Sequence, residues 1–502
     1  MKALFPVVLL ALGPIVLADE EIGKPAIEPL MRTIDLKLGQ EETIRLSDRR
    51  QATVKLVDLK ESRDTLRGAV RRAEVTVEVN GQTATLESAM YNLPTEVGGV
   101  QIDCPVTKGF VENSSGDNPW ALDADARLRL WPAGSPWIRP ESFGYPLNAR
   151  WFSSDTQMGN EPVYVNACDL PGLEKVYYHY GLDFGGAEGM VEVVAATDGV
   201  VVSARGELFK PGEYPPTVKP RYDVVYLRDD RGWYYRYSHL FEIDGSITLG
   251  KKVRMGDRIG LLGKEGGSGG WSHLHFDIQG PQPSGRYGII DAYAFAWQAY
   301  QRQHPEPLVA VARPHIVTWV GEEVTLDGSR SWSARGPQSI KQYFWLLDDG
   351  ERPTGAKLAR TYDKPGQYCE LLKVSDDEGN TAFDPAVVQV FDPKATEAKS
   401  TVPAIHAAYF PTWNIKVGDA VTFKARTFNI DPKDGYEVWD FGDGSPPVMT
   451  QSDGNARTLA KDGYAITSHR YYHPGQYLVT VHRTNIHGQK ATTKLVLTIE
   501  SR

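Results

Sequence analysis

The sequence predicts a mainly β protein made of several domains. The chain has 502 residues, more than one hydrophobic core usually holds. Apolar and polar residues alternate in short runs, as in residues 73–79, and the turn dipeptide Asn80-Gly81 directly follows that run. Such runs bounded by turn residues are typical of antiparallel hairpins. A repeated pattern in the C-terminal part further indicates two β-sandwiches.

Residues 25–155 form the first predicted unit, a β-rich N-terminal domain. Residues 52–57 also alternate, which supports the strand prediction. The end of this region is rich in aromatic residues, with Trp131, Trp137 and Trp151. These side chains could line a groove, but ordinary core packing is the simpler explanation. The role of this domain stays open.

Residues 1–18 are predicted to be a signal peptide. Lys2 supplies a positive charge, an apolar run follows, and the small residue Ala18 precedes two acidic residues. A short membrane anchor is the alternative. No other stretch is long and apolar enough to span a bilayer. We therefore expect an exported protein, either secreted or held in the periplasm or cell envelope of a bacterium.

Charge and cysteine content narrow the functional classes. The net charge of −9 is modest and argues against binding to nucleic acid. Three cysteines do not make a disulfide framework. Cys104 and Cys168 could pair, whereas Cys369 belongs to a different domain and has no partner there.

Four histidines and one aspartate stand out in the middle of the chain. They occur as His179-x-x-x-Asp183, then His239, then His273-x-His275. Residues two apart on a strand point to the same face, so we expect the last two imidazoles to project together. Positions 179 and 183 would also share a face if that stretch is extended.

Glycine and hairpin signals surround these motifs. Gly181 leaves space for the close approach of another group. Each histidine motif alone could belong to a packed or solvent-facing side chain. Their order among predicted hairpins favours a metal site built on a β-scaffold.

These residue types suit hydrolytic chemistry. Two imidazoles and one carboxylate can hold a zinc ion and leave its fourth position for water. Such a centre keeps a net positive charge, which polarises a carbonyl and lowers the pKa of bound water toward neutrality. The two remaining histidines could orient the water and stabilise an oxyanion. The sequence has no HExxH glutamate, so a histidine must act as the base.

The motifs resemble those of the lysostaphin/LytM-type zinc metallopeptidases, a family of peptidoglycan endopeptidases. Residues 179–183 resemble the family's HxGxD block, residues 237–240 its YxHL block and residues 273–276 its HLHF block, which a glycine-rich run precedes. The resemblance covers residues 175–295, within a peptidase domain expected at 156–303. Trp271-Ser272 departs from the family, which usually has a small residue there, and this change could narrow the groove.

The resemblance implies a role for each motif residue. It assigns His179, Asp183 and His275 as zinc ligands and His239 and His273 as catalytic residues. The implied function is a secreted zinc metallo-endopeptidase with an antiparallel β catalytic domain. It would hydrolyse peptide bonds in peptidoglycan stem peptides or cross-links by attack of zinc-bound water. The alternatives are a non-catalytic wall-binding regulator of other hydrolases and a secreted protease that acts on protein.

The C-terminal repeat covers residues 306–393 and 403–500, here called the first and second C-terminal modules. Residues 345–350 parallel residues 439–444, and residues 362–368 parallel residues 471–477. Both modules resemble PKD domains, and this resemblance implies two Ig-like β-sandwiches. Residues 392–403 are predicted to be the linker between them. We expect independent cores and an enzyme that folds without the modules. The modules could bind cell-wall polysaccharide or protein, or act only as spacers. Their aspartates could bind calcium, although turn chemistry explains them more simply.

Overall fold

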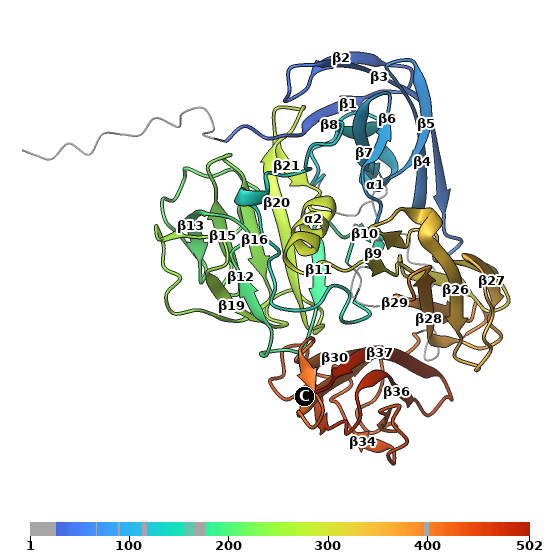
Figure 1. Cartoon of the computed structure of the whole chain (residues 1–502). Helices are drawn as coiled ribbons and strands as arrows, with labels where there is room; N and C mark the ends of the chain where they lie inside the picture. Colours follow the sequence, from blue (N-terminus) through green and yellow to red (C-terminus); the bar gives the residue numbers. More distant parts are fainter. Residues whose placement is uncertain are drawn as a thin grey trace, which may run out of the picture.

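The computed structural model describes residues 27–66, 68–88, 91–112, 118–156, 158–159, 162–164, 176–395 and 401–502. The fold is mainly β, as predicted (Figure 1). The predicted signal peptide and Cys168 lie outside the described residues. Cys104 and Cys369 are buried free thiols. Within the described ranges, no helix has the length and apolar character needed to cross a membrane.

The N-terminal region consists of two four-stranded antiparallel sheets, ordered β1-β8-β7-β6 and β2-β3-β4-β5. The predicted hairpin at Asn80-Gly81 is confirmed: it joins β4 to β5, and both residues have positive φ, as a tight two-residue turn requires. The elements are β1 (Arg32–Leu36), β2 (Glu41–Arg45), β3 (Gln51–Arg63), β4 (Val70–Val79), β5 (Gln82–Glu87), β6 (Thr95–Val97), β7 (Val100–Thr107), α1 (Lys108–Glu112) and β8 (Ala126–Pro132).

The central region is built on an eight-stranded sheet whose main path is β11-β20-β16-β15-β13-β14, with a smaller β12-β19-β17 sheet. The elements are β9 (Pro162–Tyr164), β10 (Val176–Tyr178), β11 (Leu182–Gly185), β12 (Glu192–Val194), β13 (Gly199–Ala204), β14 (Glu207–Leu208), β15 (Val225–Arg228), β16 (Tyr234–Ser238), β17 (Leu240–Ile243), β18 (Lys252–Val253), β19 (Arg258–Leu262), β20 (His273–Pro281), β21 (Tyr287–Ile290) and α2 (Tyr293–Gln303).

The segment before this sheet belongs to the same hydrophobic core. Phe143 packs against Tyr235 and Phe276 of the sheet. Trp131 and Trp151 are buried in this core, and Trp137 packs against it half-buried. The tryptophans therefore serve core packing, the simpler of the two explanations.

The two C-terminal modules have separate hydrophobic cores, as predicted. The elements of the first are β22 (Leu308–Val309), β23 (Ile316–Trp319), β24 (Glu323–Asp327), β25 (Trp332–Ser333), β26 (Ile340–Leu346), β27 (Lys357–Thr361), β28 (Gly366–Asp376) and β29 (Thr381–Phe391). Those of the second are β30 (Ala404–Phe410), β31 (Ile415–Lys416), β32 (Val421–Phe428), β33 (Glu437–Asp440), β34 (Val448–Thr450), β35 (Ala465–His469), β36 (Gly475–Thr484) and β37 (Lys490–Glu500).

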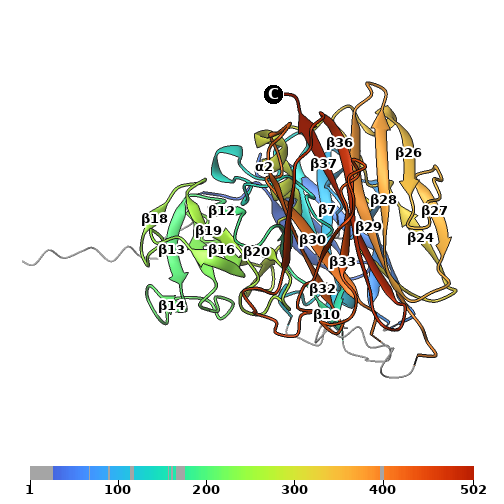
Figure 2. The ribbon, with the colours of Figure 1, turned by 90° about the horizontal axis from the view of Figure 1, so that it is seen from below.

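The modules are nevertheless joined by more than a linker. Strands β28 and β37 pair in parallel, so the two main sheets merge into one nine-stranded sheet (Figure 2). The Gln367 side chain crosses this junction and donates to the backbone carbonyls of Ile405 and Thr492. The two modules therefore keep separate cores, while backbone hydrogen bonds between β28 and β37 connect them directly.

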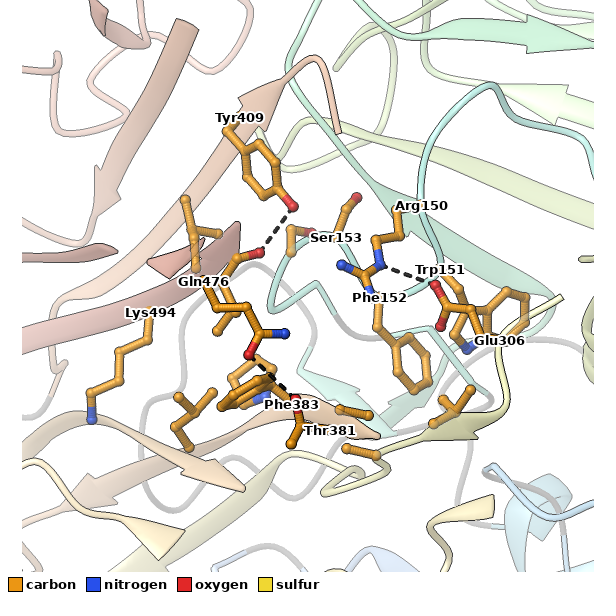
Figure 3. A pocket seen from close by; sticks show the side chains of 18 residues that line it. Arg150, Trp151, Phe152, Ser153, Glu306, Thr381, Phe383, Tyr409, Gln476 and Lys494 are labelled. Atoms are coloured by element: carbon orange, nitrogen blue, oxygen red, sulfur yellow. Dashed lines mark hydrogen bonds and ion pairs between the residues drawn. The ribbon is translucent and has the colours of Figure 1, made fainter. Parts of the chain in front are cut away.

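Both modules also pack on the central region. Arg313 of the first module is buried, pairs with Asp384 and donates to the carbonyl of Ser154 at 2.6 Å. Thr493 of the second module donates to the buried Asp155 at 2.6 Å. A cavity of about 50 Å³ remains where the three parts meet, room for a few water molecules. Figure 3 shows the ion pair of Arg150 and Glu306 at its edge.

These contacts change the expectation for a shortened chain. We expect removal of residues 304–502 to lower the thermal midpoint of unfolding by roughly 10 °C, because losing buried polar partners worth about 3 kcal/mol has that effect. Differential scanning calorimetry of the full and shortened chains measures this shift. An unchanged midpoint would show that the modules are separable after all.

Candidate active site

Three neighbouring strands bring the predicted site residues together. Strand β20 lies between β11 and β16. Asp183 of β11 stands opposite His275 of β20, and Ser238 at the end of β16 stands opposite the same histidine. His239 follows Ser238 directly. A few residues of local sequence on each strand therefore converge on one point of the sheet.

Strand β20 supplies two of the histidines through its alternation. Residues 273, 275, 277 and 279 are polar, whereas Leu274, Phe276 and Ile278 between them are fully buried in the core. Because successive side chains of a strand point to opposite faces, the apolar set fixes the orientation of the polar set. The prediction that His273 and His275 share a face is confirmed.

His179 reaches the site differently from the expectation. Residues 179–181 lie between β10 and β11 and are not part of a strand, so the condition under which positions 179 and 183 would share a face by alternation is not met. Gly181 turns the chain with φ of +89°. A Cβ at this position would lie 2.8 Å from the carbonyl oxygen of Phe276. The predicted close approach at Gly181 is therefore confirmed, and the approaching group is the backbone of β20.

His179, Asp183 and His275 form a compact donor group. Asp183 Oδ1 lies 3.1 Å from His179 Nε2 and 3.0 Å from His275 Nδ1, and these two nitrogens are 2.8 Å apart. One donor atom from each residue lies within 4.8 Å of the others, a grouping that could hold a metal ion. Two imidazole nitrogens and one carboxylate oxygen suit zinc. The residues present therefore fit the predicted ion.

The charge state of Asp183 agrees with this use. Burial opposes ionisation, but the neighbouring imidazole of His179 holds the pKa of the Asp183 carboxyl well below its usual range. The group is therefore a carboxylate at neutral pH, as a metal ligand must be.

A second carboxylate orients His275, and the sequence reasoning missed it. Asp277 Oδ2 lies 3.1 Å from His275 Nε2, and Asp277 is completely buried. Gln279 donates to its other oxygen at 2.8 Å, and Arg236 lies 3.3 Å away. A proton held at Nε2 by Asp277 leaves the Nδ1 lone pair free for the donor group. The signal was present in the sequence, because Asp277 is the next residue on the polar face of the same strand.

His239 and His273 stand beside the donor group as a pair. Their ring centroids are 4.7 Å apart, and His273 Nε2 lies 3.5 Å from Asp183 Oδ2. The Nδ1 atom of His273 is 3.0 Å from the carbonyl of Trp271, and that of His239 is 2.6 Å from the carbonyl of Glu265. Both carbonyls can only accept, so each imidazole carries its proton on Nδ1 and presents Nε2 as a lone pair.

Burial keeps both imidazoles uncharged. It lowers the pKa of His273 to about 3 and also lowers the pKa of His239. Neutral imidazoles can accept a proton near pH 7, which is the state that a general base requires.

Asp223 supports His239 from a position 16 residues earlier in the chain, just before β15. His239 has φ of +65°, a conformation uncommon outside glycine, and its backbone amide donates to Asp223 Oδ2 at 3.0 Å. Burial opposes the charge on Asp223, but His239 and Arg221 hold the pKa of its carboxyl below the usual range. No spacing or pattern in the sequence marks this aspartate as part of the site.

Three family models match the chain, each over one part of it. Residues 177–285 match peptidase family M23, and residues 304–390 and 412–498 match PKD domains. The first match contains all five predicted site residues. The chain therefore carries a peptidase domain followed by two Ig-like PKD domains, as the sequence motifs predicted.

Relatives are similar over short stretches only. Collagenase ColA of Clostridium perfringens is 35% identical over 88 residues, 18% of this chain and 8% of that protein. The dyslexia-associated protein KIAA0319 homolog of Rattus norvegicus is 36% identical over 90 residues, 16% of this chain and 8% of that protein. The chain thus spans less than a tenth of the length of these curated relatives.

Solved structures also match parts of the chain. One of Helicobacter pylori Csd3 covers 54% of this chain and 79% of its own, at 13% identity and a TM-score of 0.20. One of carbohydrate-binding modules from the β-sandwich superfamily covers 39% of this chain and 93% of its own, at 14% identity and a TM-score of 0.17.

Proposed function

We propose that this chain, with its M23 peptidase domain and two PKD domains, is a secreted zinc metallo-endopeptidase that cleaves peptide bonds in peptidoglycan. The observation that carries the proposal is the His179, Asp183 and His275 donor group beside a pair of neutral histidines. Every position of the predicted site is filled, which argues against a purely binding regulator.

In this proposal, His179, Asp183 and His275 hold the ion. A zinc ion bound there supplies a Lewis acid that polarises the scissile carbonyl and makes water more acidic. Asp183 provides the only negative charge among the three ligands, so a divalent ion keeps a net positive charge. Asp277 keeps the imidazole of His275 in the orientation and tautomer that ligation needs.

His239 and His273 handle the proton and the developing charge. Each presents an unprotonated Nε2, because a backbone carbonyl holds the proton on Nδ1. One of them accepts the proton of the attacking water and returns it to the leaving amine. Once protonated, this histidine also stabilises the oxyanion of the tetrahedral intermediate.

The substrate is tested by digestion. Purified insoluble peptidoglycan is incubated with the zinc-loaded protein, and released muropeptides are identified by mass spectrometry. We expect cuts at peptide bonds with the glycan chains intact, and no release after the same protein is stripped with a chelator. Casein is digested in parallel.

Each other outcome selects an alternative. Cleavage of casein without release of muropeptides would identify a protease that acts on protein. If neither substrate is cut while the wall material still binds the protein, the chain is a wall-binding regulator and the proposal is wrong.

A further inference from the structure

The second C-terminal module carries an insertion that the first lacks. The stretch from the motif tryptophan to the motif tyrosine runs from Trp345 to Tyr362 in the first module and from Trp439 to Tyr471 in the second, where it is nearly twice as long. Residues 451–464 of this stretch, here called the insertion, lie against the central region. Figure 1 shows the second module in contact with both the central region and the first module.

The insertion and strand β32 contact the loop that leads into β20. This glycine-rich loop comprises residues 266–272. The rings of Trp271 and Phe428 stack with centroids 4.0 Å apart and planes within 2° of parallel. The amide of Ser272 donates to the Tyr464 hydroxyl at 2.8 Å. The side chain of Asn455 donates to the carbonyl of Gly269 at 3.0 Å.

Arg426 ties the loop to the insertion from inside the interface. This arginine is completely buried and donates to the carbonyl of Gly270 at 3.0 Å. It also forms a two-bond ion pair with Asp453, at 2.8 Å for each bond, and donates to the carbonyl of Thr458 at 2.9 Å. A planar guanidinium shared among these acceptors fixes the loop relative to the insertion.

The second module packs so closely against the loop that position 270 must be glycine. Gly270 has φ of +91°, and a Cβ there would lie 2.3 Å from the side-chain oxygen of Asn455 and 2.7 Å from Arg426. Only glycine both adopts this positive φ readily and has no Cβ to clash with Asn455 and Arg426. Trp271, where the sequence departs from the lysostaphin-type pattern, is the residue that docks on Phe428. Its ring therefore serves the contact with the module.

The loop in turn holds a proposed catalytic residue. The carbonyl of Trp271 accepts from Nδ1 of His273 at 3.0 Å, which sets the tautomer and tilt of that imidazole. The hydroxyl of Ser272 donates to the carbonyl of Gly186 at 2.8 Å on the side of β11. The peptide between Trp271 and Ser272 is thus held by the module through one residue's ring and the next residue's amide.

We propose that the second C-terminal module positions His273 through the glycine-rich loop, with Tyr464, Arg426 and Phe428 as positioning residues. The inference rests on the proposed function only for the catalytic role of His273. Small displacements of a catalytic group cost up to about 100-fold in rate. The module then contributes to turnover on every substrate, including small soluble peptides that bind no wall polymer.

Tyr464→Phe tests this with the loss of one hydroxyl group. We expect kcat on a soluble peptide to fall about tenfold, with KM changed less than about twofold and zinc content unchanged. Hydrogen–deuterium exchange should also accelerate in a peptide that contains residues 268–273. Asn455→Gly removes the hydrogen bond to the carbonyl of Gly269 and should loosen the attachment of the same loop. Glycine adopts the φ of +60° at this position without backbone strain.

Tyr471→Phe is the matched control. Its hydroxyl donates at 3.1 Å to the carbonyl of Phe441 within the module's own core, so its loss affects the stability of the module and leaves the loop in place. If Tyr464→Phe matches this control in both kcat and exchange, the positioning role is wrong. If the unaltered protein hydrolyses nothing, the proposed function fails instead, and exchange alone decides whether the module holds the loop.

Discussion

Replacing Asp183 by alanine should remove both the bound zinc and the hydrolytic activity. This residue supplies the only charge among the proposed ligands, and one of its oxygens lies within 3.1 Å of both imidazole donors. We expect zinc to fall from one ion per chain to almost none after dialysis against a weak chelator. Activity should fall by more than the roughly 100-fold that changes around intact ligands cause. Elemental analysis and peptide hydrolysis measure the two effects.

A surface aspartate provides the control for this experiment. Asp230 is exposed on a turn of the same domain. Asp230→Ala should keep its zinc and its activity, so a loss confined to Asp183→Ala reflects the site itself. Full zinc occupancy in Asp183→Ala would remove this residue from the ligand set.

Local pattern was sufficient to predict the parts of the site that lie on one strand. His273 and His275 share a face because Leu274 and Phe276 must enter the core, and this follows from alternation alone. The same rule, carried one step further, would have identified Asp277. The close approach at Gly181 could also be predicted, because a close backbone approach is a common reason for a glycine within a β motif.

Apart from Asp277, the parts that sequence reasoning missed depend on pairing between different strands or modules. Asp223 reaches His239 only after β15 and β16 have folded against each other. Trp271 and Phe428 meet across more than 150 residues of chain. The junction of β28 with β37 is a backbone pairing that side-chain patterns do not encode. A repeat predicts the fold of each module, whereas the contacts between modules depend on the surfaces that meet.

Removing either histidine of the neutral pair should separate catalysis from metal binding. His273→Ala and His239→Asn are the appropriate changes, because His239 has φ of +65° and asparagine tolerates that conformation better than alanine. We expect both variants to keep one zinc ion per chain and to lose about 100- to 10,000-fold in kcat, the usual contribution of a general acid or base.

The geometry gives the reason for this separation. The Nδ1 atoms of both rings are engaged by backbone carbonyls, and His273 Nε2 lies 3.5 Å from Asp183 Oδ2. The donor group therefore stays complete when either ring is removed. His487 is an exposed histidine in the second module. His487→Ala is therefore the control, because it removes a histidine that lies outside the site. If His273→Ala or His239→Asn loses its metal, that histidine is a ligand, and the roles assigned to the five residues must be exchanged.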